Sequence, residues 1–166
     1  MIRVAKETDI ERLMNIYNEA IENTIATFDL EKKSLDDRKV WFKDHINNPY
    51  IILVEEIDGV VAGYASLSRY RDRKAFDKTV EISIYIAPEY RGRGIGSRLM
   101  KEILDYAKNN KKVEVVVSLI TGENAGSCHL HEKFGFEYCG EFKNVGTKFG
   151  KNLDLKFYQI IYERDA

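Results

Sequence analysis

Hydrophobic and polar positions along the chain follow two different periods, which predict helices and strands in turn. The first helical period starts beside Thr8 and Glu11, whose spacing is that of a capping box. The apolar positions in it are Ile10, Leu13, Tyr17, Ala20 and Ile21. Because these residues recur every three or four positions, they predict one buried face of a helix.

Three further helices are expected along the chain. Residues 34–37 open the second helix, which should stop near Pro49. The third follows a glycine-rich turn, and a short fourth helix over residues 127–134 ends at Gly135, a residue that readily adopts the left-handed conformation of a helix stop. The apolar positions assigned to these helices are Val40, Trp41 and Ile46 in the second, and Leu99, Ile103, Leu104 and Ala107 in the third.

The clearest strand signal is a hairpin made of residues 50–57 and 60–70, joined by an Asp58-Gly59 turn. Other strands are expected at residues 2–5, 79–87, 113–119, 137–145 and 153–162. The resulting order, β-α-α-β-β-β-α-β-α-β-β, predicts an α+β (mixed α/β) layered structure. With 166 residues and no linker or repeat, residues 1–166 are expected to form a single domain.

Composition narrows the classes of partner. The 26 basic and 27 acidic residues give a formal charge of −1, which argues against a protein that binds a nucleic-acid backbone. No long apolar run and no apolar N-terminal segment occur, so we expect no membrane partner and a cytoplasmic location. In that location the thiols of Cys128 and Cys139 are expected to be reduced, and because they lack histidine partners at ligand spacing no metal site is predicted.

The most informative segment is the glycine-rich turn Arg91-Gly92-Arg93-Gly94-Ile95-Gly96 between the strand at 79–87 and the third helix. Glycines let backbone N–H groups approach a ligand without interference from Cβ. The N-terminus of the following helix adds unpaired donors and a positive dipole end. This combination predicts an anion site, most naturally for a pyrophosphate. The spacing differs from the G-x-G-x-x-G of dinucleotide folds, and no P-loop G-K-[ST] occurs.

The turn resembles the cofactor motif [RQ]-x-x-G-x-[GA] of the GNAT acyl-CoA N-acyltransferases. A second resemblance lies in residues 124–127 and 130–136, which are similar to that family's N-x-x-S…GF segment. Membership implies the GNAT fold, a central, mostly antiparallel sheet with a splayed strand pair, and acetyl-CoA as co-substrate. The residues that the resemblance assigns to the cofactor are Ile84, Tyr85, Ile86, Arg91, Gly92, Arg93, Gly94, Ile95, Gly96, Ser97 and Asn124.

Two residues are candidates for acid–base catalysis of acetyl transfer, which requires a deprotonated amine. Glu81 stands in an otherwise apolar strand, where it faces either a cleft or solvent. His131 lies on the short fourth helix, and an ordinary histidine pKa near 6.5 suits proton transfer, although a solvated histidine is the plainer interpretation. The resemblance implies that Glu81 is the general base and His131 a second base or an acid.

Residues 75–81, 130–136 and 145–154 further resemble one subgroup, the phosphinothricin and methionine sulfone or sulfoximine acetyltransferases. One departure is Asn152, which stands where a tryptophan is usual and which bears on the acceptor rather than the reaction. The acceptor residues implied by the resemblance are Phe28, Arg71, Arg73 and Phe76. The arginines belong to a basic loop before the strand at 79–87, and guanidinium groups suit carboxylate and phosphinate oxygens.

The predicted function is therefore direct N-acetylation of a small amino-acid analogue in a ternary complex with acetyl-CoA. Acetylation of a protein N-terminus or of another small amine would use the same cofactor site and remains an alternative. Polyamines fit less well, because the basic loop would repel them. A non-catalytic acyl-CoA sensor is a third interpretation, and the presence of both Glu81 and His131 argues against it. The family resemblance also implies a homodimer.

Overall fold

A single seven-stranded sheet runs through the structure, a computed structural model that describes residues 1–164. Its strand order is β1-β2-β3-β4-β5-β7-β6. The strands are β1 (Ile2–Val4), β2 (Ile51–Ile57), β3 (Val60–Arg69), β4 (Thr79–Ile86), β5 (Val115–Thr121), β6 (Glu137–Lys148) and β7 (Lys151–Ile161). The helices are α1 (Ile10–Asn23), α2 (Leu35–Lys43), α3 (Ile95–Asn109) and α4 (Ala125–Lys133), with short 3-10 turns at Glu7–Asp9, Lys74–Phe76 and Pro88–Tyr90. The predicted order of elements and the mixed α/β class are confirmed.

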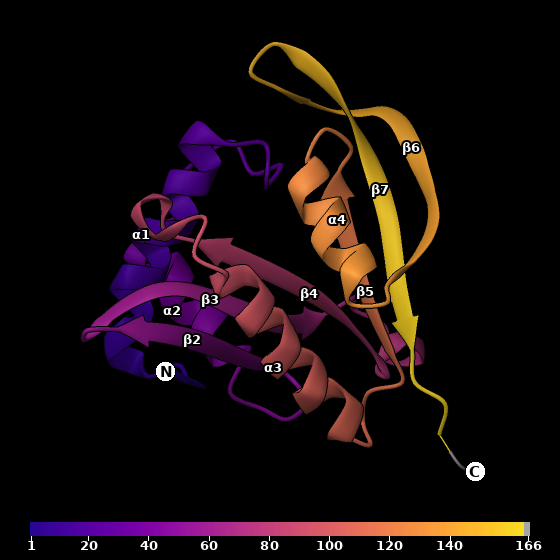
Figure 1. The fold of residues 1–166 in the computed structure, drawn as a ribbon, viewed down its shortest axis with the longest axis horizontal. Helices are drawn as coiled ribbons and strands as arrows, with labels where there is room; N and C mark the ends of the chain where they lie inside the picture. Colours follow the sequence, from indigo (N-terminus) through magenta and orange to yellow (C-terminus); the bar gives the residue numbers. More distant parts are fainter. Residues whose placement is uncertain (165–166) are drawn as a thin grey trace.

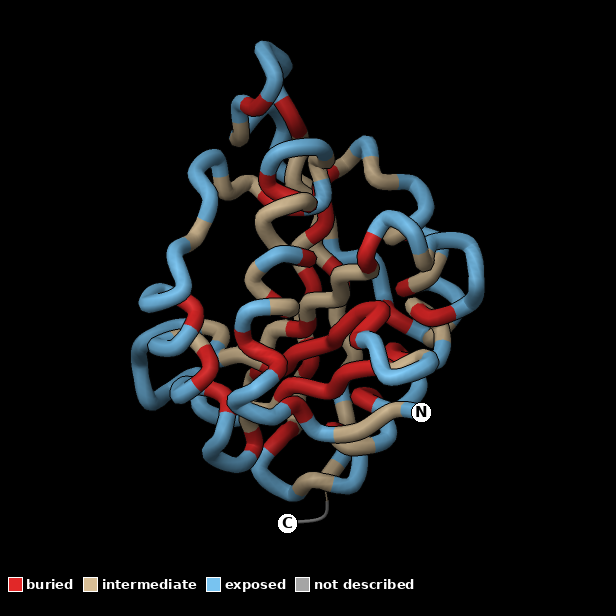
Figure 2. The backbone as a smooth tube through the Cα atoms, turned by 90° about the vertical axis from the view of Figure 1, so that its left-hand side faces the viewer, coloured by how far each residue is buried: buried red, intermediate tan, exposed pale blue. Residues whose placement is uncertain are grey.

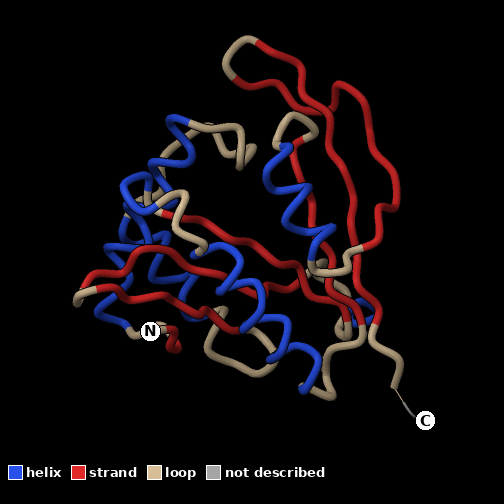
Figure 3. The backbone as a smooth tube through the Cα atoms, in the orientation of Figure 1, coloured by secondary structure: helices blue, strands red, loops and turns tan. Residues whose placement is uncertain are grey.

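The sheet is antiparallel except where β4 meets β5. These two strands pair in parallel over three positions only, from Thr79 with Val115 to Glu81 with Val117. Beyond Glu81 they diverge, and the open wedge between them is visible in Figures 1 and 3. On its other side β4 stays paired with β3 as far as Ile86, which lies opposite Gly63. The far half of β4 therefore has one backbone edge without a neighbouring strand.

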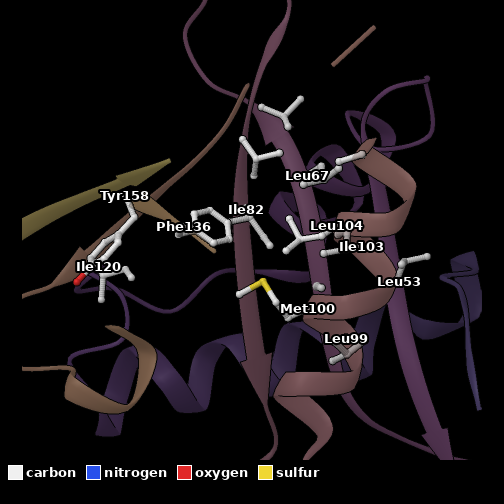
Figure 4. Close-up of a cluster of buried hydrophobic side chains, with 14 of the residues drawn as sticks. Leu53, Leu67, Ile82, Leu99, Met100, Ile103, Leu104, Ile120, Phe136 and Tyr158 are labelled. Carbon is white, nitrogen blue, oxygen red and sulfur yellow. The ribbon is translucent and has the colours of Figure 1, made fainter. Parts of the chain in front are cut away.

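One face of the sheet is covered by α3. Its side chains Leu99 and Ile103 are fully buried and belong to the same cluster as Leu67 of β3 and Ile82 of β4 (Figure 4). Burying a side chain of this size stabilises the fold by roughly 1.5–3 kcal/mol. This packing fixes the start of α3 beside the open end of β4.

The other face is covered by α1 and α2. Leu13 and Ile16 of α1 and Phe42 of α2 pack with Val54 and Tyr64 of the sheet. Figure 2 shows that the buried residues concentrate in the middle of the molecule, between these layers. No helix in residues 1–164 is both long enough and apolar enough to cross a membrane.

The β6–β7 hairpin projects beyond the rest of the sheet (Figure 1). Its strands are longer than predicted, because Phe149 and Gly150, with φ of 53° and 72°, join them in a tight turn. Such left-handed pairs match the twist of a hairpin. The predicted turn at Asp58-Gly59 has the same geometry, with φ of 50° and 80°.

Two expectations about the helices are wrong. No capping box forms between Thr8 and Glu11; instead the Asp9 carboxylate accepts the Lys6 backbone N–H at 2.7 Å and pairs with Arg3 at 2.8 Å. The ion pair with Arg3 fixes the Asp9 carboxylate at the 3-10 turn Glu7–Asp9, which precedes α1, so Asp9 caps that turn rather than α1.

The second wrong expectation concerns the end of α2. The helix ends at Lys43, so Ile46 lies beyond it and is 63% exposed. Val40 is also exposed rather than part of the core. The end is fixed by His45, whose Nδ1 lies 2.6 Å from the Trp41 carbonyl and whose Nε2 lies 2.7 Å from Ser68 Oγ.

Candidate active site

The wedge between β4 and β5 contains a cavity of about 620 Å³. β4 contributes Ile82 through Ile86, and β5 contributes Ser118 through Thr121. The turn before α3, the end of α1 and the start of α4 close the remaining sides. A volume of this size accommodates a cofactor arm or a drug-sized ligand. The free edge of β4 can offer such a ligand the backbone groups that a neighbouring strand would otherwise use.

The glycine-rich turn lies at one end of this cavity. Gly92 and Gly94 have φ of 78° and 77°, a conformation that side chains with a Cβ rarely adopt. Among the described residues, none accepts a hydrogen bond from the backbone N–H groups of Gly92, Arg93 or Gly94. Because α3 begins at Ile95, its first unpaired N–H groups add to this set. The predicted anion site therefore has donors available at the mouth of the wedge.

An ion pair between the half-exposed Arg98 and the buried Glu55 holds this turn in place. Arg98 Nε lies 2.6 Å from Glu55 Oε1 and Nη2 lies 3.2 Å from Oε2, and the Glu55 side chain is only 6% exposed. Arg98 Nη1 also donates to the Arg93 carbonyl at 3.0 Å. Arg98 thereby links the turn to strand β2. Sequence reasoning missed this pair, although Glu55 is a charged residue in an apolar strand, the same signal that pointed to Glu81.

Of the predicted cofactor residues, the structure brings seven to the wall of this cavity. They are Ile84, Tyr85, Ile86, Arg91, Gly92, Gly96 and Asn124. The other four, Arg93, Gly94, Ile95 and Ser97, lie in the same turn or first helical turn but do not line the cavity. The Ile95 side chain is 1% exposed and belongs to the core, so only its backbone can face a ligand. The Asn124 side chain accepts the Ser127 N–H at 3.2 Å and so caps α4.

Glu81 lies at the point where the sheet splits. It is the last residue of β4 that pairs with β5, and it lies opposite Ser68 on β3. Burial raises the pKa of its carboxyl group, and the positive charge of Arg71 partly opposes that rise. A carboxylate with a raised pKa is a better proton acceptor near neutral pH than an exposed one. The Glu81 residue is half-buried, between the two alternatives that the sequence left open, a cleft and open solvent.

His131 is buried in the wall of the wedge, with both ring nitrogens occupied. Its Nδ1 lies 2.7 Å from the Ser127 carbonyl oxygen, which can only accept, so Nδ1 carries the proton. Nε2 lies 2.8 Å from the Ser118 hydroxyl, which then donates to it. Burial lowers the pKa of His131, so the neutral ring is favoured. Any proton exchange with the cavity would pass through Ser118, a polar residue in an apolar strand that sequence reasoning overlooked.

A second cavity, of about 520 Å³, lies on the α1–α2 side of the sheet. It is lined by Tyr17, Asp29, Lys33, Asp37, Arg38, Val40, Trp41, Asp44, Tyr64, Ser66, Ser68, Ser83 and Tyr85. Ser83 and Tyr85 line both cavities, so the two meet at β4. Because alternate residues of a strand share a face, Glu81 points to the same side as Ser83 and Tyr85. The carboxyl group is thus placed beside the junction of the two cavities.

The predicted acceptor residues fall into two groups. Arg71, Arg73 and Phe76 lie together in the exposed loop between β3 and β4, where Tyr70 contacts both the Arg71 guanidinium and the Phe76 ring. Phe28 lies elsewhere: it packs against Gly146 and lines a separate cavity beside the β6–β7 hairpin. The structure does not bring Phe28 to the other three within this chain.

Asn152, the departure from the subgroup's pattern, also lies on the β6–β7 hairpin. It is exposed, faces Thr147 across the hairpin and accepts a hydrogen bond from its hydroxyl at 3.1 Å. It lines neither of the two cavities that meet at β4.

Comparison with known proteins agrees with this geometry. Residues 10–136 match the model of the acetyltransferase (GNAT) family. The chain belongs to the GNAT acetyltransferase family. The matched region includes Glu81, the glycine-rich turn and His131. The resemblance inferred from residues 91–96 is confirmed.

Individual relatives extend the similarity to nearly the whole chain. The L-methionine sulfoximine/L-methionine sulfone acetyltransferase of Pseudomonas aeruginosa (strain PAO1) is 38% identical, over 96% of this chain and 92% of its own. The solved structure of YncA, a putative acetyltransferase from Salmonella typhimurium with its cofactor acetyl-CoA, has a TM-score of 0.94 and 36% identity, covering 100% of this chain and 95% of that one. A ribosomal-protein-alanine N-acetyltransferase from Brucella melitensis has a TM-score of 0.92 and 41% identity, covering 97% and 99%.

Proposed function

We propose that this GNAT acetyltransferase transfers acetyl from acetyl-CoA to the α-amine of a small amino-acid analogue of the methionine sulfone, methionine sulfoximine or phosphinothricin type. The observation that carries the proposal is the position of Glu81 beside the junction of two cavities, one with an anion-binding turn and the other with a polar lining. The similarity to the Pseudomonas methionine sulfoximine and sulfone acetyltransferase supports this acceptor class.

On this proposal, residues 91–97 hold the diphosphate of acetyl-CoA through backbone N–H groups, with Arg91 and Arg93 adding positive charge. In the structure, Arg91 Nη2 lies 2.7 Å from Glu19 Oε2, and Arg91 lines the same cavity. The free edge of β4 at Ile84, Tyr85 and Ile86 pairs with the pantetheine amides. The acetyl thioester then lies near Glu81, at the closed end of the wedge.

The chemistry needs one proton acceptor and one proton donor. Glu81 accepts a proton from the acceptor's ammonium or amine, directly or through water, and the nitrogen then forms the new C–N bond as the C–S bond breaks. The departing thiolate takes up a proton. That proton is supplied by the one released from the acceptor nitrogen, carried by water. His131, neutral and accepting from the Ser118 hydroxyl through Nε2, would serve as a second base on this path rather than as the acid. No covalent enzyme intermediate is required.

Arg71 and Arg73 would hold the acceptor's carboxylate near Glu81, since Arg71 is the residue whose charge acts on the Glu81 pKa. Phe76 would close the loop over it. Phe28 would contribute from the hairpin side, where it lines a cavity that includes no residue of that loop. A homodimer would be one way to complete such a site.

The homodimer and a cytoplasmic location are part of the same proposal. The projecting hairpin exposes Phe142, Val145 and Phe149, which are 61%, 54% and 58% accessible, a surface suited to contact with a second copy. Cys139 is a free, exposed thiol, which suits a reducing compartment. Light scattering during gel filtration would test the dimer, and a mass equal to one chain would refute it.

The test of function is CoA-thiol release from acetyl-CoA with a panel of acceptors. The panel would contain phosphinothricin, L-methionine sulfone, L-methionine sulfoximine, ordinary amino acids, spermidine and a peptide with a free N-terminal alanine. We expect turnover with the first three and little with spermidine. Turnover with the peptide alone would move the assignment to protein N-termini, and no turnover with any amine would leave acyl-CoA sensing.

A further inference from the structure

We propose that the second cavity is a binding subsite for the oxygen-bearing end of the acceptor's side chain, with the Arg38 guanidinium as its principal hydrogen-bond donor. The inference rests on the proposed function and deepens it, because it names the group that decides which acceptors are used. Sulfone, sulfoximine and phosphinate groups share the required chemistry: two or more compact, electron-rich atoms that accept hydrogen bonds.

Arg38 is a buried cation that lacks a counter-ion. The residue is 5% exposed, and within residues 1–164 it forms no ion pair. Among the described residues, its one hydrogen bond runs from Nη2 to the Tyr64 hydroxyl at 3.3 Å, and Nε has no partner there. Burying an unpaired charge is strongly unfavourable, so the unsatisfied Nε–H of Arg38 calls for a partner that a bound ligand can supply.

Aromatic rings hold the guanidinium in position. Its central carbon lies 3.6 Å from the Trp41 ring centroid and 4.6 Å from that of Tyr17. Cation–π contacts of this kind offset part of the lost hydration and restrict the side chain to one orientation. Both rings line the second cavity together with Arg38. The group is therefore fixed at the cavity wall before a ligand arrives.

Hydroxyl groups supply further donors on the sheet side of the cavity. Ser66 and Ser83 lie directly opposite each other on β3 and β4, and neither hydroxyl has a hydrogen-bond partner among the described residues. Ser66 is 2% exposed, so its hydroxyl faces the interior of the cavity rather than open solvent. One buried cation and two free hydroxyls suit a group with several oxygen acceptors.

The carboxylates of this cavity do not neutralise Arg38. Asp29 accepts the Tyr17 hydroxyl and lies 3.8 Å from Lys33 Nζ. Asp37 caps α2 by accepting the Ser34 N–H at 3.0 Å. Asp44, the third carboxylate of the lining, is exposed beyond the end of α2.

Because Arg38 lies away from Glu81, we assign Arg38 to the side-chain end of the acceptor, opposite its amine. An α-amine and its carboxylate share one carbon atom, so the group that binds the carboxylate must lie near the base. Arg71 meets that requirement, because its positive charge opposes the rise of the Glu81 pKa. Arg38 lines the second cavity with Ser83 and bonds Tyr64, which lies opposite Tyr85, so it lies further along the same face of β4 than Glu81. An acceptor with its amine at Glu81 would extend along this face, past Ser83, toward Arg38.

The test uses Trp41, the only tryptophan in the chain, as a reporter of occupancy. Its fluorescence would be titrated with L-methionine sulfone and with L-methionine, which has the same length but lacks the two sulfonyl oxygens. We expect the sulfone to bind about 10–100-fold more tightly, the difference expected for hydrogen bonds to a charged donor. Equal affinity for the two amino acids would overturn the proposal.

The variant Arg38→Met keeps the length and apolar stem of the side chain but removes its donors. It should reduce the preference for the sulfone to within about twofold while leaving acetyl-CoA affinity unchanged, and Arg38→Lys should restore part of the preference. Lys39→Met, on the exposed side of the same helix, is the matched control and should behave like the parent. A preference that survives in Arg38→Met, measured by calorimetry as well as fluorescence, would assign Arg38 a purely structural role.

These outcomes separate the subsite from the function it rests on. If no acceptor supports CoA-thiol release but the sulfone still binds in preference through Arg38, the subsite stands and the acetyl-transfer proposal fails. If transfer occurs with equal KM for oxygenated and plain side chains, the function stands and the subsite is wrong.

Discussion

The two cavities that meet at β4 are built in different ways. The wedge between β4 and β5 is formed largely by backbone: a free strand edge, left-handed glycines and the start of a helix. The cavity on the α1–α2 side is formed by side chains from four separate segments, and its key cation lies on a helix with no motif around it. The first is recognisable because special backbone conformations require glycine, and the second is not, because many residue types could occupy its positions.

The two kinds of construction also suit the two cavities to different tasks. A backbone site binds any ligand with the right phosphates and amides, so it specifies the cofactor and the reaction. A side-chain site changes with single substitutions, so it specifies the acceptor. Glu81 lines neither cavity itself, but it ends the β4–β5 ladder and shares a face of β4 with Ser83 and Tyr85, which line both.

The largest effect is expected for Glu81→Gln, which keeps the shape of the side chain but removes the proton acceptor. Turnover should fall about 10²–10⁴-fold, while acetyl-CoA affinity stays unchanged, because the backbone site is untouched. Steady-state kinetics and acetyl-CoA calorimetry would measure the two quantities. Glu137→Gln, an exposed position at the start of β6, is the control. Unchanged turnover in Glu81→Gln would remove Glu81 from the mechanism.

The variant Gly94→Val should weaken cofactor binding at the glycine-rich turn. A β-branched residue at φ of 77° is strained, and its Cβ would lie 3.2 Å from Arg98 Nη1. We expect acetyl-CoA to bind about 10–100-fold more weakly, since displaced N–H groups lose hydrogen bonds to a charged ligand. Gly59→Val is a matched control, because it has the same left-handed φ, of 80°, in the β2–β3 turn. Equal losses in both variants would attribute the effect to strain in the fold alone.

A smaller effect is expected for Arg98→Gln, which cuts the link between the turn and Glu55. Without the Arg98 contact to the Arg93 carbonyl, the turn is less well ordered before ligand binds. Acetyl-CoA affinity should weaken by about 1 kcal/mol, roughly fivefold. The melting temperature should also fall, because Glu55 is left buried without its partner. An unchanged affinity together with a lower melting temperature would make the pair purely structural.

The smallest effect is a shift in pH dependence. Burial raises the Glu81 pKa, so kcat/KM should rise with pH as this carboxyl group loses its proton. Arg71 favours the charged carboxylate and so lowers that pKa; Arg71→Gln should move the acid limb of the profile to higher pH. Glu81→Gln should abolish that limb. A limb that stays in place in Arg71→Gln would show that another group titrates.

The sequence predicted most of the architecture, because period and turn chemistry are local properties. The Asp58-Gly59 hairpin and the buried face of α3 at Leu99 and Ile103 follow directly from neighbouring residues. The wrong predictions concern helix ends that are fixed by residues distant in the sequence. Arg3 relocates the Asp9 cap, and Ser68 fixes the end of α2 through His45, contacts that no local window contains.

The residues of the candidate site also fall into those that local sequence predicts and those that depend on distant contacts. The glycine turn and Glu81 could be predicted from single segments, and both lie in the region that matches the family. Arg38, Ser118 and the Glu55–Arg98 pair depend on which side chains meet after folding. A useful signal existed for two of them, since Glu55 and Ser118 are polar residues inside apolar strands. Arg38 carried none, because an arginine on an amphipathic helix is ordinarily a solvated one.

The exposed loop between β3 and β4, residues 70–78, has a consequence for how such an enzyme changes over time. Besides ion pairs of Asp72 and Asp77 with Arg69 and of Lys78 with Glu114, its side-chain contacts are internal, such as Tyr70 with Arg71 and with Phe76, and its side chains do not belong to the core. Substitutions at exposed positions of this kind usually alter folding stability by no more than about 0.5 kcal/mol. If Arg71, Arg73 and Phe76 hold the acceptor as proposed, acceptor preference can therefore change by mutation in this loop without first requiring compensating changes in the core. New substrates are accessible to such an enzyme one residue at a time, while the machinery for acetyl transfer stays constant.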